Sequence, residues 1–384
     1  VRFAILGQVD GDGADRPTAG AARNAGMLAG AGRGALFIDD DAELRPAAPA
    51  GAGPGLELSS AVDASELTFY PALEAALDRA TAEVDLLGAH HAMLGLMAAT
   101  CIEALPADES LEVGHALPGL VRAVTTGDAW VRATLLGGYG DSTMGSPGYF
   151  LTLRDQARER LLVDYPRHRL TRALARGVPR ATLSSGRWFS AAHVAFDLRT
   201  PAPPFVPVGR NSEGLFSAVL RQTRPTDLFG YPPWMIAHRP AAARPAFTDD
   251  DLFALFTRLP PHHQLMLWVA SYQPEAGADE DARQNALADD LIAAAAMPAD
   301  GYRDMVRELH ATEAAARVAY FTESLDLYDD QPADWAADLQ RAIALAGEPA
   351  EPEEPAHAQA LLGLYGQLLQ AWPRLAAAAA TLAA

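Results

Sequence analysis

The sequence predicts an α/β protein in which a mostly parallel sheet, covered by helices on both faces, is followed by an all-α region. Residues 1–38 read as strand, loop, helix and strand, the alternation expected of a parallel sheet. After Arg239 only helical patterns follow. The chain has 384 residues, of which 49% are hydrophobic and 21% charged, so it can bury a substantial core. We therefore predict two domains, 1–244 and 245–384.

The first elements are predicted from short local patterns. Residues 1–6 form an apolar run rich in strand formers, and residues 8–17 are turn-forming and acidic. Residues 21–30 have helix-forming composition, and residues 35–38 are a compact apolar strand that stops at three aspartates. Carboxylates at the end of such a strand lie where α/β folds bind ligands, outside the carboxyl edge of the sheet.

The middle of the chain is predicted to mix helices with strands. Residues 46–55 lack periodicity and predict an irregular excursion, whereas residues 70–82 and 84–105 show helical patterns. The most apolar stretch, 86–102, is too short and too rich in Ala and Gly to span a bilayer comfortably. Residues 131–153 combine β-branched residues with five glycines, which predicts strands and turns.

The remainder is predicted to be helical. Thr248 followed by three aspartates is typical of a helix N-terminus. One apolar face follows, and two more apolar stripes come later, with an acidic, Pro-rich loop predicted at 347–357. The face and the two stripes comprise Leu252, Leu255, Phe256 and Leu259; Met305, Leu309 and Val318; and Leu361, Leu364, Tyr365, Leu368 and Trp372.

Charge and cysteine content restrict the function classes. The formal net charge is −19 and no Lys/Arg cluster interrupts it, which disfavours nucleic acid as a partner. A nucleotide ligand is also an anion, so a bound cation would have to bridge the nucleotide and the acidic protein. The single cysteine, Cys101, excludes an internal disulfide framework, and with no basic, apolar leader we expect a cytoplasmic protein. Because the chain begins with Val in a predicted strand, we also consider that the natural start lies upstream.

The sharpest pattern runs from residue 21 to residue 41. Arg23, Asn24 and Gly26 lie on the predicted helix, and the predicted strand ends at Asp39-Asp40-Asp41. Two carboxylates at alternate positions can converge on one hard divalent cation, although an acidic triplet can also be a solvated turn. The pattern resembles GT-A glycosyltransferases of the family-two kind, in which an Arg-Asn-x-Gly helix precedes a strand ending in a DxD motif.

This resemblance implies a GT-A fold and a site for a nucleoside diphosphate-sugar. Asp39 and Asp41 would hold Mn²⁺ or Mg²⁺, which neutralises the charge on the departing diphosphate. Arg23, Asn24 and Asp40 would complete the donor contacts.

A second segment, 196–216, looks like the region in which these transferases carry an x-Glu-Asp motif. Glu213 occupies the position of the general base for the acceptor hydroxyl, but Ser212 replaces the usual preceding Glu. The alternative is a helix-start Glu near the helix dipole. Gly186 matches the glycine turn that relatives place near the donor sugar, and Trp188 is a candidate for stacking on a sugar ring or for burial in a core.

The third landmark is His238, which resembles the C-terminal histidine of the GT-A core that completes the metal shell. Its alternative is a hydrogen-bonded structural residue. Asp141, after Gly137, Gly138 and Gly140, is a weaker candidate for a ligand-facing turn. The adjacent pairs at 90–91 and 262–263 are poor metal sites, because neighbouring residues on a helix do not share a face.

The resemblance implies sugar transfer from a nucleoside diphosphate-sugar to a glycan or another hydroxyl acceptor, with inversion, in a hexosyltransferase-type enzyme. A homo-oligomer is compatible with this. The alternative is a catalytically degenerate nucleotide-sugar or protein-binding module, in which Ser212 signals lost chemistry. A nucleotidyltransferase is disfavoured because no Gly-rich, basic triphosphate loop is visible.

Overall fold

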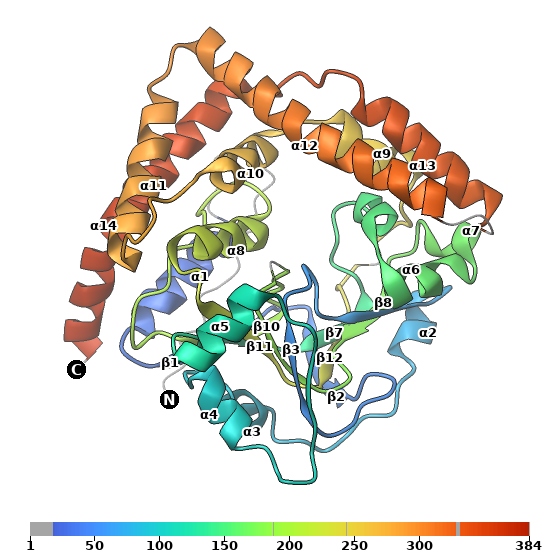
Figure 1. Ribbon diagram of the computed structural model, residues 1–384, viewed down its shortest axis with the longest axis vertical. Coiled ribbons are helices and arrows are strands. Elements are labelled where there is room, and N and C mark those ends of the chain that lie inside the picture. Colours follow the sequence, from blue (N-terminus) through green and yellow to red (C-terminus); the bar gives the residue numbers. More distant parts are fainter. Residues whose placement is uncertain (1–17, 187, 243, 328–330, 384) are drawn as a thin grey trace.

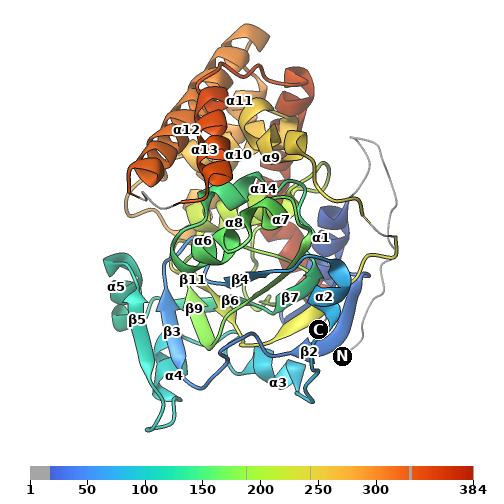
Figure 2. The same cartoon turned by 90° about the vertical axis from the view of Figure 1, so that its right-hand side faces the viewer.

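The computed structural model describes residues 18–383 except 187, 243 and 328–330. The strand predicted at 1–6 and the loop at 8–17 lie outside the described residues. The rest is a mixed α/β structure in which two sheets lie beneath a layer of helices (Figures 1 and 2). None of the described helices combines the length and apolarity needed to cross a bilayer.

The strands form a seven-stranded sheet, in the order β1-β10-β6-β11-β9-β3-β5, and a five-stranded sheet, in the order β2-β12-β7-β8-β4. Three strand pairs, β1 and β2, β6 and β7, and β11 and β12, pass from one sheet to the other through connections of one to three residues. The bounds are β1 Gly34–Ile38, β2 Ala42–Ala47, β3 Leu56–Ser59, β4 Glu66–Phe69, β5 Leu111–His115, β6 Trp130–Leu135, β7 Gly137–Asp141, β8 Ala173–Gly177, β9 Ala181–Ser184, β10 His193–Asp197, β11 Asp227–Tyr231 and β12 Met235–His238.

The prediction of a mostly parallel sheet is wrong, because both sheets are mixed. Among the described strands, six neighbouring pairs are antiparallel and four are parallel. The order of strand, loop, helix and strand in residues 1–38 describes only how the chain enters β1. Strand β1 itself pairs antiparallel with β10, which lies more than 150 residues away. Local alternation therefore did not determine the direction of the later strands.

The helices cover the sheets and also form the layer above them. The predicted helix at 21–30 is confirmed as α1. The bounds are α1 Ala19–Ala29, α2 Leu73–Leu77, α3 Leu86–His91, α4 Ala98–Glu103, α5 Pro118–Thr126, the 3₁₀ helix η1 Gly148–Thr152, α6 Asp155–Leu162, α7 Tyr165–His168, α8 Ser212–Thr223, α9 Asp249–Thr257, α10 Pro261–Ser271, α11 Glu280–Ala295, α12 Ala299–Leu327, α13 Ala333–Ala346 and α14 Pro355–Ala383.

The helix predicted at 84–105 is broken into α3 and α4. Gly95 has φ +70°, and a β-carbon there would lie 2.2 Å from Nη2 of Arg199. The chain around Gly95 instead bonds to β6, since the Gly95 N–H donates to the Val131 carbonyl and the Val131 N–H donates to the Leu96 carbonyl. Pairing with a strand therefore replaces one helical turn. The helix predicted at 70–82 is also shorter and is confined to α2.

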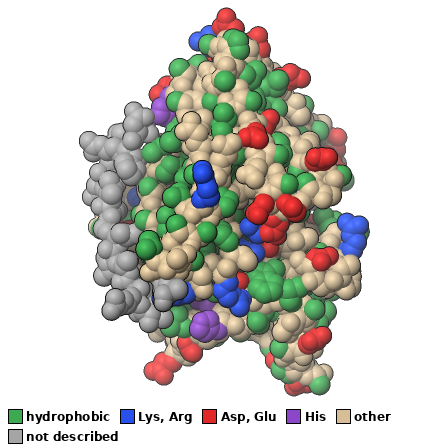
Figure 3. All heavy atoms as spheres, turned by 90° about the vertical axis from the view of Figure 1, so that its left-hand side faces the viewer, with side chains coloured by type: hydrophobic (Ala, Val, Ile, Leu, Met, Phe, Trp, Pro, Cys, Tyr) green, Lys and Arg blue, Asp and Glu red, His purple; other side chains and the backbone are tan. Residues whose placement is uncertain are grey.

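The helix start predicted at Thr248 is confirmed as the start of α9, and the structure adds a capping box between Thr248 and Asp251. The regular elements that the structure describes after residue 248 are all helices. The assignment of two residues to the predicted apolar stripes is wrong. Met305 is exposed because the buried face of α12 passes through Val306 and Ala314. Leu364 is exposed because the buried face of α14 passes through Tyr365 and Leu369. Figure 3 shows acidic side chains spread among hydrophobic ones on the face that carries α11 and α14.

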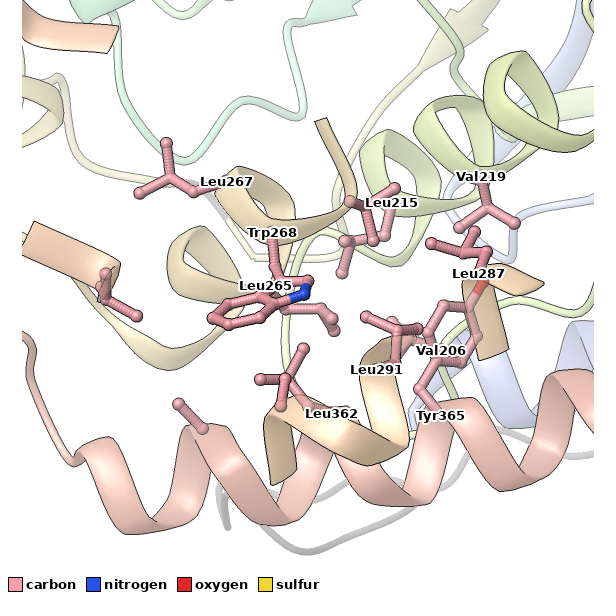
Figure 4. Packing of buried hydrophobic residues seen from close by; sticks show 14 of the residues in the cluster. Val206, Leu215, Val219, Leu265, Leu267, Trp268, Leu287, Leu291, Leu362 and Tyr365 are labelled. Carbon is pink, nitrogen blue, oxygen red and sulfur yellow. The ribbon is translucent and has the colours of Figure 1, made fainter. Parts of the chain in front are cut away.

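These helices share cores with the α/β part. Val206, Leu215 and Val219 pack against Leu265, Leu287, Leu291, Leu362 and Tyr365 (Figure 4). The indole N–H of Trp372 donates to the Ala202 carbonyl at 2.7 Å. The predicted boundary at 244/245 thus crosses continuous packing, and an independent C-terminal domain stays a prediction.

Candidate functional site

The three aspartates form the turn that joins β1 to β2, at the point where the chain passes between the sheets. The Ala42 N–H donates to the Asp39 carbonyl at 3.1 Å, and the Asp39 N–H donates to the Ala192 carbonyl at 3.0 Å. Asp40 is exposed, whereas Asp39 and Asp41 are partly buried. The strand ending in an acidic turn, as predicted, is confirmed.

Arg23 joins this turn to Glu213. Its Nη2 lies 2.9 Å from Oδ1 of Asp39 and 3.0 Å from Oε1 of Glu213, and its side chain is only 8% exposed. Helix α1 can bring Arg23 this close because Gly20 packs on the Val206 carbonyl, where a β-carbon would lie at 2.1 Å. Asp39, predicted for donor binding, and Glu213, predicted for catalysis, therefore share one guanidinium, although they are 174 positions apart.

A strained turn positions Glu213 in the first turn of α8. The preceding Asn211 has φ +59°, in the left-handed region that non-glycine residues adopt at a cost of about 1 kcal/mol or more. Burial raises the pKa of Glu213, while Arg23 opposes that rise and Asp39 adds to it. The location at a helix N-terminus agrees with the alternative structural role, but the ion pair and partial exposure also suit a proton acceptor.

Asn24 clamps the segment that leads to α8. Its side-chain amide donates to the Phe205 carbonyl at 2.8 Å, and its carbonyl accepts from the Phe205 N–H at 2.7 Å. The residue is buried. These contacts give Asn24 a positioning role, and its predicted contact with the donor stays a prediction.

His238 and Arg244 surround the other aspartate. Nε2 of His238 lies 2.8 Å from Oδ1 of Asp41, and Nη2 of Arg244 lies 3.6 Å from Oδ2 of the same residue. Arg244 also pairs with the buried Asp141, at 3.2 Å from Oδ1. The hydrogen bond from His238 lowers the pKa of Asp41, whereas burial raises the pKa of Asp39. The structure thus brings the acidic turn, Glu213 and His238 into one connected polar group.

The carboxylate oxygens of this group suit a hard cation, provided that a diphosphate supplies further ligands. No cluster of three or more His, Cys, Asp or Glu residues in the described parts of the chain is arranged to hold a metal by itself. Mg²⁺ usually takes only one or two carboxylates together with substrate phosphates, however. Asp39 and Asp41 fit that requirement, because each is partly exposed. Asp39 contacts Arg23 through Oδ1, whereas Asp41 contacts His238 through Oδ1 and, over the longer distance of 3.6 Å, Arg244 through Oδ2. A cation bound together with a diphosphate is therefore compatible with the site.

His238 fits the role of third ligand less well. If its Nε2–H donates to Asp41, the lone pair is on Nδ1, which is buried with no hydrogen-bond partner in the described structure. Coordination through Nε2 would move the proton to Nδ1 and leave it without an acceptor, at a cost of about 1–3 kcal/mol. The geometry therefore supports His238 more directly as a positioning partner of Asp41.

Gly186 and Trp188 make their contacts outside this group, and Asp141 is joined to it only through Arg244. Gly186 packs against Ala61, where a β-carbon would meet the carbonyl at 2.2 Å, and it follows β9, which β10, β6 and β11 separate from β1. One face of Trp188 is covered by the guanidinium of Arg176, 4.2 Å from the ring centroid. Asp141 reaches the site through Arg244, but its glycine-rich segment is strand β7 and not the suggested turn.

Sequence reasoning missed Arg244 and a buried histidine pair. Arg244 lies in an irregular segment without a motif, so no sequence signal marked it. His90 of α3 and His193 of β10 lie 3.0 Å apart through Nε2 and Nδ1, and Nδ1 of His90 lies 2.7 Å from the Thr134 hydroxyl. Burial lowers the pKa of His90 to about 3 and that of His193 to about 4.

The histidine pair predicts acid sensitivity. Both folded pKa values lie below the unfolded value, so the stabilisation is present above about pH 6.5 and is lost as the pH falls towards 4. Between pH 7 and about pH 5, we expect the free energy of unfolding to fall by about 2 kcal/mol per histidine. Urea unfolding at both pH values checks this, and His90→Gln should reduce the loss. His115→Gln, at an exposed histidine, is the matched control, and equal losses in all three proteins would contradict the prediction.

Comparisons with known proteins add no relative. A scan against protein-family models found no match, and a search of curated proteins found none either.

Proposed function

We propose that the protein is a metal-dependent glycosyltransferase with a GT-A-like site, in which Asp39 and Asp41 bind a divalent cation together with the diphosphate of a nucleotide-sugar. The observation that carries this proposal is the shared guanidinium of Arg23, which connects the acidic turn to Glu213. An acid pair beside a partly exposed carboxylate is the minimum needed to hold a leaving diphosphate and to deprotonate an acceptor.

Each residue of the group has a distinct part in this proposal. When bound, the cation would supply charge neutralisation for the leaving diphosphate. Glu213 accepts the proton of the acceptor hydroxyl, and the burial that raises its pKa makes it a stronger base at neutral pH. Arg23 holds Glu213 beside Asp39, and His238 orients Asp41. Inversion predicts a product with the anomeric configuration opposite to that of the donor, which NMR of the product decides.

One observation favours the alternative of a non-catalytic nucleotide-sugar or protein-binding module. Arg23 already occupies Oε1 of Glu213, and Ser212 stands where the related motif has an acid. An ion pair that persisted with substrate bound would keep this carboxylate from accepting a proton.

Turnover separates the two candidates. The protein is incubated with UDP- and GDP-sugars, Mn²⁺ and a panel of hydroxyl acceptors, and release of the nucleoside diphosphate is measured. Release that depends on both metal and acceptor supports the transferase. Nucleotide binding without release across the panel supports the binding module.

A further inference from the structure

Three neighbours compensate the two aspartates of the acidic turn, and they are held to different degrees. Nη2 of Arg23 lies 2.9 Å from Asp39, and the Arg23 side chain is 8% exposed. Nε2 of His238 lies 2.8 Å from Asp41, and the His238 side chain is 5% exposed. Nη2 of Arg244 approaches Asp41 only to 3.6 Å, which exceeds the length of a hydrogen bond, and its side chain is 37% exposed. Of these three neighbours, Arg244 can therefore leave its aspartate at the lowest cost.

Arg244 is held from its other side by Asp141. Nη1 of Arg244 lies 3.2 Å from Oδ1 of Asp141, whose side chain is only 4% exposed. The same oxygen accepts a hydrogen bond from the Thr143 N–H at 2.9 Å, and Thr143 has φ +59°. A β-branched residue adopts this left-handed conformation only at a cost in energy, and such strain concentrates at binding sites and switches. Asp141 is thus a fixed anchor for Arg244, whereas the approach of Arg244 to Asp41 is loose.

The backbone is anchored before Arg244 and directly after it. The Arg239 N–H donates to the Asp41 carbonyl at 2.9 Å. Nε of Arg172 donates to the Pro245 carbonyl at 2.7 Å. These anchors keep Arg244 beside the acidic turn and allow its long side chain to change partners without a rearrangement of the fold.

The charge of the connected polar group leaves a place for a divalent cation. Its ion pairs join four carboxylates to two guanidinium groups, which belong to Asp39, Asp41, Asp141 and Glu213 and to Arg23 and Arg244. With His238 neutral, two negative charges remain, and a divalent cation would balance them. A diphosphate that binds with the cation brings its own negative charge, which calls for a further cationic partner.

We infer that Arg244 exchanges partners when the site fills: it compensates Asp41 in the absence of ligand and moves to the diphosphate when a cation occupies Asp41. The inference rests on the proposed function. With a cation on Asp41, Arg244 is repelled from that carboxylate by the like charge. Its planar guanidinium can donate two parallel hydrogen bonds to phosphate oxygens, which makes it a better partner for a diphosphate than a point charge. Arg244 is therefore a residue that determines specificity for the diphosphate.

Two titrations of the full chain test this exchange. Binding of Mn²⁺ alone is followed through the EPR signal of the free ion, and binding of UDP and GDP at saturating Mn²⁺ is followed by calorimetry. We expect Arg244→Gln to bind Mn²⁺ alone about tenfold more tightly, because the cation no longer competes with a positive charge at Asp41. We expect it to bind the nucleotide about tenfold more weakly, because the bonds from the guanidinium to the diphosphate are lost.

Two further variants separate this role from a structural one. Arg244→Lys keeps the positive charge but not the planar fork, so it should bind Mn²⁺ like the wild type and the nucleotide more weakly. Because it also keeps a cation beside the buried Asp141, it carries the test if Arg244→Gln fails to fold. The matched control is Arg239→Gln, since the Arg239 side chain is 49% exposed and pairs with Glu43 instead. This variant should match the wild type in both titrations.

The signs of the two changes decide the outcome. Tighter binding of Mn²⁺ together with weaker binding of the nucleotide in Arg244→Gln supports the exchange, and any other combination, including no change, would overturn it. Nucleotide binding that Arg244→Lys leaves unchanged would overturn it as well. A wild-type protein that binds neither nucleotide in the presence of Mn²⁺ would instead contradict the proposed function, and the inference would fall with it.

Discussion

Glu213→Gln is expected to lower the rate of sugar transfer by about 10²- to 10⁴-fold, the range contributed by a general base. The amide keeps the size of the side chain and can still contact Arg23, which lies 3.0 Å from Oε1. It cannot accept a proton from the acceptor hydroxyl. Steady-state release of nucleoside diphosphate measures the loss, and binding of UDP or GDP should change little because Glu213 is not assigned to the diphosphate.

The control for this substitution is Glu213→Asp. It restores the residue type of the related x-Glu-Asp motif and keeps the carboxylate, so measurable turnover should persist. If Glu213→Gln transferred sugar at the wild-type rate, Glu213 would not be the base, and its role would be limited to the ion pair with Arg23 and the helix terminus.

Arg132→Met is expected to lower the free energy of unfolding by about 3–5 kcal/mol, the largest stability loss that we predict. Arg132 of β6 and Asp227 of β11 are 5% and 2% exposed, and Nε lies 2.7 Å from Oδ2. The substitution keeps an apolar stem but leaves Asp227 buried without its cation. The pair joins the two strands that continue into β7 and β12, and β12 carries His238, so the loss should also loosen the site.

Urea unfolding of wild type and variants checks this value. Arg303→Met removes an exposed arginine that pairs with Asp300 one turn away, and it should change stability by no more than about 0.5 kcal/mol. The double variant Arg132→Met/Asp227→Asn should be more stable than Arg132→Met alone, since the uncompensated charge is gone. A loss below about 1 kcal/mol for Arg132→Met would mean that water or another group compensates Asp227.

Local sequence patterns predicted the elements whose determinants lie within a few residues. Helix α1, strand β1, the acidic turn and the capped start of α9 all have their caps, apolar faces or turn residues in one short segment. The break between α3 and α4 was not predictable in this way. Gly95 adopts a left-handed conformation where the chain pairs with β6, more than 30 residues later: Val131 accepts a hydrogen bond from the Gly95 N–H and donates one to the Leu96 carbonyl.

The same distinction applies to the candidate site. Arg23, Asp39, Asp41, Glu213 and His238 were predicted separately from motifs, and the structure brings them together. Their pairing was not predicted, because it depends on α1, α8 and β12 meeting across long sequence separations. Arg244 contacts Asp41 without any local sequence signal, and Asp141, a weaker candidate from its glycine-rich segment, is joined to the site through Arg244; only the fold places them there.

The central claim is that Asp39 and Asp41 bind a divalent cation together with a nucleoside diphosphate. Isothermal titration of UDP and GDP, with and without Mn²⁺, into the wild-type protein and Asp41→Asn tests it most directly. Asn is close to Asp in size and can still contact His238, so a loss of binding would report the missing charge. We predict metal-dependent binding of one nucleotide that Asp41→Asn abolishes, whereas no binding in any condition, or binding that Asp41→Asn leaves unchanged, would contradict the claim.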